Sequence, residues 1–229
     1  MFFSIVIPTY EMNGSGVDFL KHNFLILKNQ TFKDFNILIS DHSVNKDIEI
    51  LCQHFKDELN IVYLKNEKNR GNSSSNLNNG LKNADGQYIK IIFQDDFLYT
   101  EKSLQELHDH IINNNNFWYI TSCQHSADGI NFHHEHSPYW NNSMQYGNNT
   151  FSSPSTLTIK NIDNKMYFNE QLIWLMDVEY YKKMYDLFGE PSYLRKINVV
   201  NRVWGGSVSN TLSSERKNAE IKLMTERYS

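Results

Sequence analysis

The sequence predicts a single α/β domain in which a mostly parallel sheet is flanked by helices. Short apolar runs rich in β-branched residues alternate with segments of helical spacing through the first 122 residues. Strands that are separated by helices run parallel when they enter one sheet, and the helices then cover both of its faces. A chain of 229 residues, 40% of them hydrophobic, is long enough to form one such core.

Each predicted strand is short and apolar. The strands are expected at residues 2–7, 35–39, 61–64, 88–93 and 117–121, and the intervening helices at 19–27, 47–55, 73–81 and 101–112. Polar side chains follow three of these strands directly, at Thr9 to Glu11, at Asp41, and at Asp95 with Asp96. Sheets of this class bind ligands at the carboxyl ends of their strands, so a binding site is predicted at that edge.

The second half of the chain has a weaker pattern. Residues 124–150 are polar and rich in histidine and asparagine, which predicts a long loop of the kind that is usually functional or mobile. After residue 155 we expect a short strand, a helix at 174–187, a strand at 193–203 and a charged helix from 213. No linker or repeat divides the chain, so residues 1–229 are interpreted as one domain with halves at 1–122 and 123–229.

Composition argues against several classes of protein. A net charge of -4 and a pI near 6.1 disfavour nucleic-acid binding through a basic surface. The two cysteines, Cys52 and Cys123, form neither a disulfide framework nor a metal-binding pair, which favours a reducing compartment. No signal peptide and no apolar run near the length of about 20 residues that spans a bilayer is found. We therefore expect a cytoplasmic protein without a transmembrane segment, with peripheral contact at the inner face of a membrane left open.

The adjacent carboxylates Asp95 and Asp96 are the strongest chemical signal. They follow the apolar run YIKIIF, and two like charges there are unfavourable unless a cation or hydrogen-bond donors neutralise them. A divalent ion that bridges the pair to a diphosphate would supply that charge. The alternative is that the pair caps the helix that follows, since aspartate is favoured in first turns.

Other patterns are weak when taken alone. Asp41 can be a ligand contact or a turn residue. Residues 69–72 (NRGN) look superficially like a phosphate-binding loop but lack its lysine and hydroxyl ending. Asp177 follows apolar residues that would raise its pKa toward that of a general base. Its alternative role is a helix cap, with Glu179 in the first turn.

In their order, these segments resemble the family 2 glycosyltransferases. Residues 4–10 (SIVIPTY) resemble the first strand and turn of that family, and residues 39–43 (ISDHS) resemble the end of its second strand. Residues 69–71, 78–81 and 84–89 resemble the stretch that leads to the metal motif, and residues 93–96 (FQDD) fall at its DxD position. Residues 174–180 (WLMDVEY) resemble the later acidic motif, which holds the catalytic base.

The resemblance implies a Rossmann-like GT-A fold and an inverting, metal-dependent glycosyltransferase of polysaccharide or glycoconjugate synthesis. Such an enzyme moves a sugar from a nucleotide-diphosphate sugar, expected from family habit to carry UDP, to a hydroxyl of a carbohydrate or glycolipid acceptor. Mn²⁺ or Mg²⁺ at Asp95 and Asp96 would neutralise the departing diphosphate, and Asp177 would take the acceptor's proton. Residues 1–122 would then be the nucleotide-sugar-binding half and 123–229 the acceptor-side half.

Family positions also imply the residues that surround the substrates. The acceptor side would include Trp174, Glu179 and Trp204. The donor would contact a larger set, namely Pro8, Thr9, Tyr10, Glu11, Asp41, Asn69, Arg70, Gly71, Asn78, Gln94 and Asp95.

The chain departs from the family pattern at three positions. Ser40 precedes Asp41 where the family often has paired aspartates. Phe93 occupies the first acidic position of the DxD motif, which leaves Asp95 as the expected direct metal ligand. Trp204 stands where the family often has a histidine, so no third protein ligand for the metal is indicated.

A histidine-rich run and several aromatic residues have two interpretations each. His133, His134, Glu135 and His136 match no zinc-binding spacing, so a solvated loop that touches the acceptor is favoured over a zinc site. Tyr139, Trp140 and Trp174 are suited equally to stacking on sugar rings and to packing in a core.

Two other functions stay open on the sequence. A nucleotidyltransferase acting on sugar phosphates would use the same sheet and carboxylates, but it usually has a glycine-rich basic loop where this chain has Pro8 to Glu11. A non-catalytic nucleotide-sugar-binding module is consistent with the altered DxD motif and with Trp204. The oligomeric state is not indicated.

Overall fold

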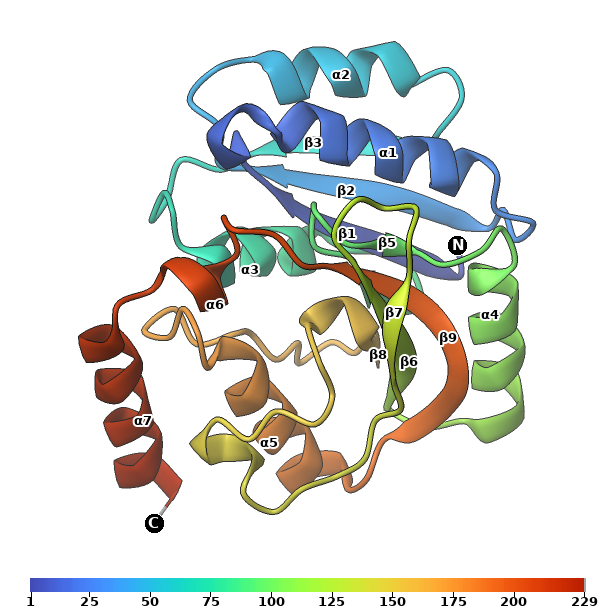
Figure 1. Ribbon diagram of the computed structural model, residues 1–229. Helices are drawn as coiled ribbons and strands as arrows, with labels where there is room; N and C mark the ends of the chain where they lie inside the picture. The colour runs from blue at the N-terminus through green and yellow to red at the C-terminus, as the bar shows by residue number, and fades with distance from the viewer. Residues whose placement is uncertain (229) are drawn as a thin grey trace.

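A nine-stranded sheet with helices on both faces organises residues 1–228, which the computed structural model describes (Figure 1). The strand order is β3-β2-β1-β4-β8-β6-β9-β5, and β7 pairs with β6 outside this path. Ser229, the last residue of the expected domain, lies outside the described residues.

Apart from η1 and β5, which are not predicted from the sequence, the elements of the first half are those expected, to within a few residues at each end. They are β1 (Phe3–Thr9), η1 (Met12–Gly14), α1 (Gly16–Lys28), β2 (Phe35–Asp41), α2 (Asp47–Phe55), β3 (Ile61–Lys65), α3 (Ser73–Asn83), β4 (Tyr88–Ile91), β5 (Phe97–Leu98) and α4 (Ser103–Asn114). The second half continues with β6 (Trp118–Ser126), β7 (His133–His136), η2 (Met144–Tyr146), η3 (Pro154–Thr156), β8 (Leu157–Lys160), α5 (Met176–Phe188), β9 (Ser192–Arg202), α6 (Val208–Thr211) and α7 (Ser214–Tyr228).

The first half of the sheet is parallel, as expected. β1 pairs in parallel with β2 and β4, and β2 pairs in parallel with β3. The second half is mixed, because β8 runs antiparallel to both β4 and β6, and β5 runs antiparallel to β9. β6 and β9 are again parallel, and the long β9 curls around this end of the sheet (Figure 1).

Alternation along β1 divides the core into two layers. Phe3, Ile5 and Ile7 pack with α1, α2 and α4, whereas Val6 faces α3 and α5. Figure 1 shows α1 and α2 on one side of β1 to β3 and α3 on the other. On α3, a β-carbon at Gly80 would overlap the Val6 side chain, so glycine is what allows the helix to approach the sheet this closely.

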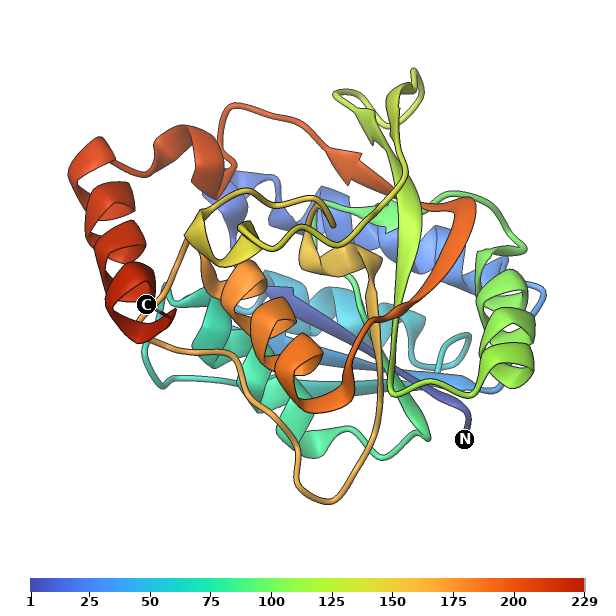
Figure 2. The same ribbon diagram turned by 90° about the horizontal axis from the view of Figure 1, so that it is seen from below.

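The prediction of one long loop at residues 124–150 is wrong for residues 124–136, which contain the end of β6 and the whole of β7. β6 continues to Ser126 and turns into β7, with Cys123 opposite His136 and His125 opposite His133. Figure 2 shows the turn of this hairpin standing away from the other elements. Because the β7 side chains are mostly exposed, no apolar alternation marks this strand in the sequence. Within residues 1–228, no helix has the length and apolar character needed to cross a membrane.

Candidate active site

The carboxyl ends of three neighbouring strands meet at one edge of the sheet. Thr9 at the end of β1 lies opposite Asp41 at the end of β2, and the Thr9 hydroxyl donates to Asp41 Oδ1 at 3.2 Å. Beyond β4, the side chain of Gln94 accepts from the Tyr10 backbone N–H at 2.9 Å and donates to the Gly16 carbonyl at 2.7 Å. The turn after β1 is therefore fixed from both sides.

Asp41 is fully buried at this edge, and its carboxylate is held by donors from the chain itself. Beside Thr9, it accepts from the Ser43 backbone N–H at 2.9 Å and from the Tyr63 hydroxyl at 2.7 Å, and it pairs with Lys65 at 3.3 Å. Burial and the hydrogen bond to Asp41 raise the pKa of Tyr63 well above its usual range. The nucleobase contact expected of Asp41 stays a prediction.

Asp96 is buried, and both of its carboxylate oxygens are occupied. Oδ2 accepts from Ser153 Oγ at 2.8 Å, from Ser155 Oγ at 2.6 Å and from Asn201 Nδ2 at 2.9 Å. Oδ1 accepts from the Arg202 backbone N–H at 2.9 Å. The cap role is wrong for this residue, since α4 begins only at Ser103. Asp96 instead ties the end of β4 to η3 and to β9.

Lys90 supports this arrangement and was missed in the sequence. It is fully buried on β4, and its ammonium group donates to the Ser155 carbonyl, next to the hydroxyl that bonds Asp96. Burial lowers the pKa of Lys90 to about 7, and the Asp96 charge acts in the opposite direction. The available signal was a lone lysine in the apolar run YIKIIF, because a lysine is almost never fully buried without a partner.

Asp95 points its carboxylate toward a different partner. The indole N–H of Trp204 donates to Asp95 Oδ2 at 2.8 Å, and Arg202 Nε donates to the Asp95 carbonyl at 3.1 Å. Burial raises the pKa of Asp95, and the adjacent Asp96 charge raises it further. Trp204, at the position where the resemblance implies a histidine, thus lies within hydrogen-bond distance of the expected metal ligand.

Asp177 is the second residue of α5 and is partly buried. The Asn149 side chain donates to its Oδ2 at 2.8 Å, and the Val178 N–H donates to its Oδ1 at 2.7 Å. Burial raises the pKa of Asp177 to about 7, with a smaller contribution from the negative charge of Glu220. Leu175, not Asp177, is the N-cap position of the helix. A carboxyl group that titrates near neutral pH is suited to general-base chemistry.

One cleft of about 470 Å³ brings Asp95, Asp96 and Asp177 together. Of the expected site residues, Tyr10, Asp95, Asp96, Trp174 and Asp177 line it. It is also lined by polar residues for which the sequence indicated no role, namely His125, Asn149, Ser153, Asn201 and Arg202. Arg202 begins the segment that contains Trp204 and resembles a family motif, whereas no motif marks the other four.

The remaining expected contacts lie outside the lining of this cleft. Asn78 bonds the backbone of Phe168 in both directions, and Asn69 donates to the Glu170 carboxylate at 2.6 Å. Glu179 is fully buried and pairs with Arg227 at 2.7 Å. The other residues of the expected set outside the lining are Pro8, Thr9, Glu11, Asp41, Arg70, Gly71, Gln94 and Trp204.

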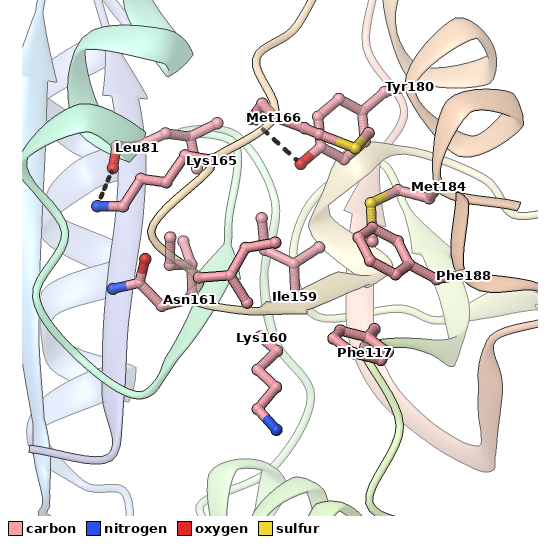
Figure 3. A pocket seen from close by; sticks show the side chains of 12 residues that line it. Leu81, Phe117, Ile159, Lys160, Asn161, Lys165, Met166, Tyr180, Met184 and Phe188 are labelled. Carbon is pink, nitrogen blue, oxygen red and sulfur yellow. Dashed lines mark hydrogen bonds between the residues drawn. The ribbon is translucent and has the colours of Figure 1, made fainter. Parts of the chain in front are cut away.

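The structure places the histidine-rich run and the aromatic residues in different surroundings. His133, His134 and Glu135 are exposed on β7, and only His125 of the opposite strand reaches the cleft. Trp140 stacks on Tyr185 with ring centroids 3.7 Å apart, which is a packing role. A second, small pocket of about 20 Å³ lies between α3, β8 and α5 (Figure 3). No carboxylate is among the residues that line it, so it offers no comparable chemistry.

The residues of the cleft are compatible with a divalent ion that is held partly by the protein and partly by the phosphates of a bound substrate. Among residues 1–228, no group of three or more histidine, cysteine, aspartate or glutamate side chains is arranged to hold a metal. Mg²⁺ usually needs only one or two carboxylates together with substrate phosphates. Asp95 fits that requirement better than Asp96, whose oxygens already accept four hydrogen bonds.

Solved structures show the same architecture. S. aureus TarS 1-349 in complex with UDP-GlcNAc matches with a TM-score of 0.74 at 18% identity, over 99% of this chain and 66% of that one. A mannosyltransferase of Pyrobaculum calidifontis, solved with GDP-Man and Mn²⁺, matches with a TM-score of 0.60 at 13% identity, over 88% of this chain and 57% of that one. The fold is therefore the GT-A fold of nucleotide-sugar-dependent glycosyltransferases.

Sequence comparison identifies the family. The pattern described as Glycosyl transferase family 2 matches residues 4–184, and the chain belongs to that family. An uncharacterized glycosyltransferase of Methanocaldococcus jannaschii is 27% identical over 87% of this chain and 71% of its own length.

Two further relatives are named for their reactions. The GalNAc(5)-diNAcBac-PP-undecaprenol beta-1,3-glucosyltransferase of Campylobacter jejuni is 30% identical over 42% of this chain. The poly(ribitol-phosphate) beta-glucosyltransferase of Bacillus spizizenii is 29% identical over 55% of it. The matched segments span only 30% and 18% of the lengths of these two relatives.

The hydrogen bonds of the two adjacent aspartates predict different effects on stability. Asp96→Asn should lower the free energy of unfolding by about 1–3 kcal/mol, because an amide cannot accept all four hydrogen bonds in this buried position. Asp95→Asn is the matched control and should change stability by less, since its amide oxygen can still accept from Trp204. Urea denaturation followed by circular dichroism measures both, and an Asp96→Asn variant as stable as the wild type would contradict the anchoring role.

Proposed function

We propose that this chain is the catalytic domain of an inverting glycosyltransferase that moves a sugar from a nucleoside-diphosphate sugar to an acceptor hydroxyl. One observation carries the proposal. Asp95 from the end of a central strand and Asp177 from the start of α5 line the same cleft, and the pKa of Asp177 is raised to about 7. One carboxylate is thus available for the diphosphate side of the reaction and the other for the acceptor side.

The donor would lie along the carboxyl ends of β1, β2 and β4. Asp41 and the turn from Thr9 to Glu11 would contact the nucleoside, and UDP is the proposed nucleotide, as it is the one bound in the TarS structures. Asp95 would hold a Mn²⁺ or Mg²⁺ ion, which when bound offsets the negative charge of the departing diphosphate. Arg202, whose side chain lines the cleft beside Asp95, adds a fixed positive charge there.

Asp177 would act on the acceptor. As the acceptor oxygen bonds to the anomeric carbon, its proton passes to the Asp177 carboxylate, and the bond from that carbon to the diphosphate oxygen breaks. Asn149 holds one carboxylate oxygen at 2.8 Å and thereby orients the base. Trp174, at the same wall of the cleft, offers an aromatic face to the acceptor sugar.

The named relatives support a proposal for the class of acceptor. Their acceptors are an undecaprenol-linked glycan and a poly(ribitol phosphate). A carbohydrate or glycolipid acceptor is therefore proposed for this chain, in polysaccharide or glycoconjugate synthesis, with peripheral contact at the inner face of a membrane. A nucleotidyltransferase and a non-catalytic binding module are the alternatives that the assay below must separate.

The function is tested by the product that leaves the donor. Incubation of the protein with Mn²⁺ and UDP-glucose, UDP-N-acetylglucosamine or GDP-mannose should release a nucleoside diphosphate, faster with an acceptor than with water alone. A nucleotidyltransferase would instead form pyrophosphate from a nucleoside triphosphate and a sugar phosphate. Donor binding without any release would favour the binding module.

The metal assignment predicts a selective loss of affinity. Asp95→Asn should weaken Mn²⁺-dependent binding of UDP by at least about 10-fold, because a neutral amide is a poorer ligand for a hard cation than a carboxylate. Isothermal titration of UDP with and without Mn²⁺ measures the effect. Equal UDP affinity in the variant and the wild type under both conditions would remove Asp95 from the metal site.

The base assignment predicts a loss of turnover and a specific pH dependence. Asp177→Asn should reduce kcat on the order of 100-fold, the usual scale for loss of a general base, while UDP affinity changes little. Since only the deprotonated carboxylate accepts a proton, wild-type kcat should rise with pH through about 7, the raised pKa of Asp177. Near-normal kcat in Asp177→Asn would show that another group takes the proton.

A further inference from the structure

The C-terminal helix α7 lies beyond the residues that match the family, which end at 184. It lies at the edge of the molecule and packs against η2 (Figure 1). Met224 of α7 is fully buried in the core layer that contains α5, and Arg227 pairs with the buried Glu179 at 2.7 Å. The helix is thus docked onto the element that carries Asp177.

Glu220 makes the most specific contact of this helix. It is 2% exposed, and its carboxylate accepts from three successive backbone N–H groups, those of Ile173 at 2.9 Å, Trp174 at 2.9 Å and Leu175 at 3.0 Å. Arg216, one turn earlier on α7, donates to the same carboxylate at 3.0 Å. Both oxygens of Glu220 are therefore used.

These three N–H groups are the ones that lead into α5. The first N–H groups of a helix have no partner within the helix, and Leu175 at the N-cap position supplies no side-chain acceptor. Of these groups, Glu220 binds the N–H of Leu175, together with the N–H groups of Ile173 and Trp174 in the segment just before the helix, and its negative charge lies where the helix dipole favours an anion. Asp177 lies two residues after Leu175, the last residue that Glu220 binds, so the position of Asp177 depends on how residues 173–175 are held.

The same contact shapes the wall of the cleft. Ile173, Trp174 and Asp177 all line it, and the ammonium group of Lys217 on α7 lies 5.4 Å from the Trp174 ring centroid. The Glu220 charge also contributes to the raised pKa of Asp177.

We propose that Glu220 is a positioning residue for the catalytic base, and that α7 is thereby a working part of the active site. The inference rests on the proposed function of Asp177 as the base. Glu220 touches no substrate in this scheme. It fixes the backbone of residues 173–175, which sets the direction in which the Asp177 carboxylate faces the acceptor.

Several charged groups set the field at Asp177. The Glu220 charge acts on Asp177 from α7, where Arg216 is its partner, and Tyr181 interacts with Asp177 from α5 itself. Asp95, Asp96 and Arg202 line the same cleft. His125 also lines the cleft, and burial lowers its pKa. A change confined to α7 leaves these groups of the cleft in place, so its effect on the pH profile can be assigned to the Glu220 pair.

The test compares Glu220→Gln with Glu226→Gln, which removes an exposed carboxylate from the same helix. Glu220→Gln should reduce kcat by about 10- to 100-fold, the scale of a small misplacement of a reacting group, with UDP affinity and the KM for UDP-sugar nearly unchanged. The acid side of its pH profile should move to lower pH, because a negative charge that raises the pKa of Asp177 is gone. Glu226→Gln should match the wild type in all of these measurements.

A second variant keeps the test decisive if Glu220→Gln fails to fold. Arg216→Gln leaves Glu220 bound to residues 173–175 but removes its counter-charge, so the acid side of the profile should move to higher pH, the opposite direction. UDP release from the donor found active in the donor assay is the readout, with circular dichroism as a check on folding.

Wild-type kcat and pH profile in folded Glu220→Gln, or an unshifted profile in Arg216→Gln, would overturn the inference. The Asp177→Asn variant keeps the two hypotheses apart. If it is inactive while Glu220→Gln is normal, the base assignment stands and only the positioning role fails. If Asp177→Asn is active, the base assignment itself is wrong.

Discussion

The carboxylate of Asp96 joins the two halves of the molecule. It is buried where β4 ends, and its four donors come from η3 and from the end of β9, segments that lie 57 to 106 residues further along the chain. Burial raises the pKa of Asp96, and the hydrogen bonds from the second half of the chain lower it, so these donors offset part of the cost of burying the charge. Lys90 stabilises the same contact between β4 and η3, because its ammonium group donates to the carbonyl of Ser155, whose hydroxyl donates to Asp96.

The hydrogen bonds of Asp96 also determine where Asp95 and Arg202 lie in the cleft. With Asp96 committed to hydrogen bonds within the protein, its neighbour Asp95 is left facing the cleft, and the Arg202 side chain is brought to the same edge by the backbone bond to Asp96. The adjacent acidic residues of the DxD position therefore divide into one that builds the site and one that can bind a ligand. Two adjacent carboxylates with equal exposure would repel each other and compete for the same donors.

The acceptor side is organised by longer-range contacts. Asp177 owes its raised pKa chiefly to burial, which depends on the packing of α5 against the sheet and on the segment around Asn149. Charged residues of α7 then contact the start of α5, through Glu220 at residues 173–175 just before the helix and through Arg227 at Glu179 in its first turn. Glu179, which the sequence suggested for the acceptor side, is buried in this interface because Arg227 neutralises it.

The sequence by itself determined the parallel first half, because local periodicity and strand-end polarity are properties of neighbouring residues. It also singled out Asp95, Asp96 and Asp177 as candidates, since each follows an apolar segment and falls at a position that resembles an acidic motif of the family. Only the tertiary structure decided the roles of Lys90, Asn78 and Glu220 and the pairing of β7 with β6. Their partners lie between about ten and 100 residues away in the chain. A hydrogen bond over such a separation leaves no local pattern, so these side chains acquire their roles only when the packed layers bring the segments together.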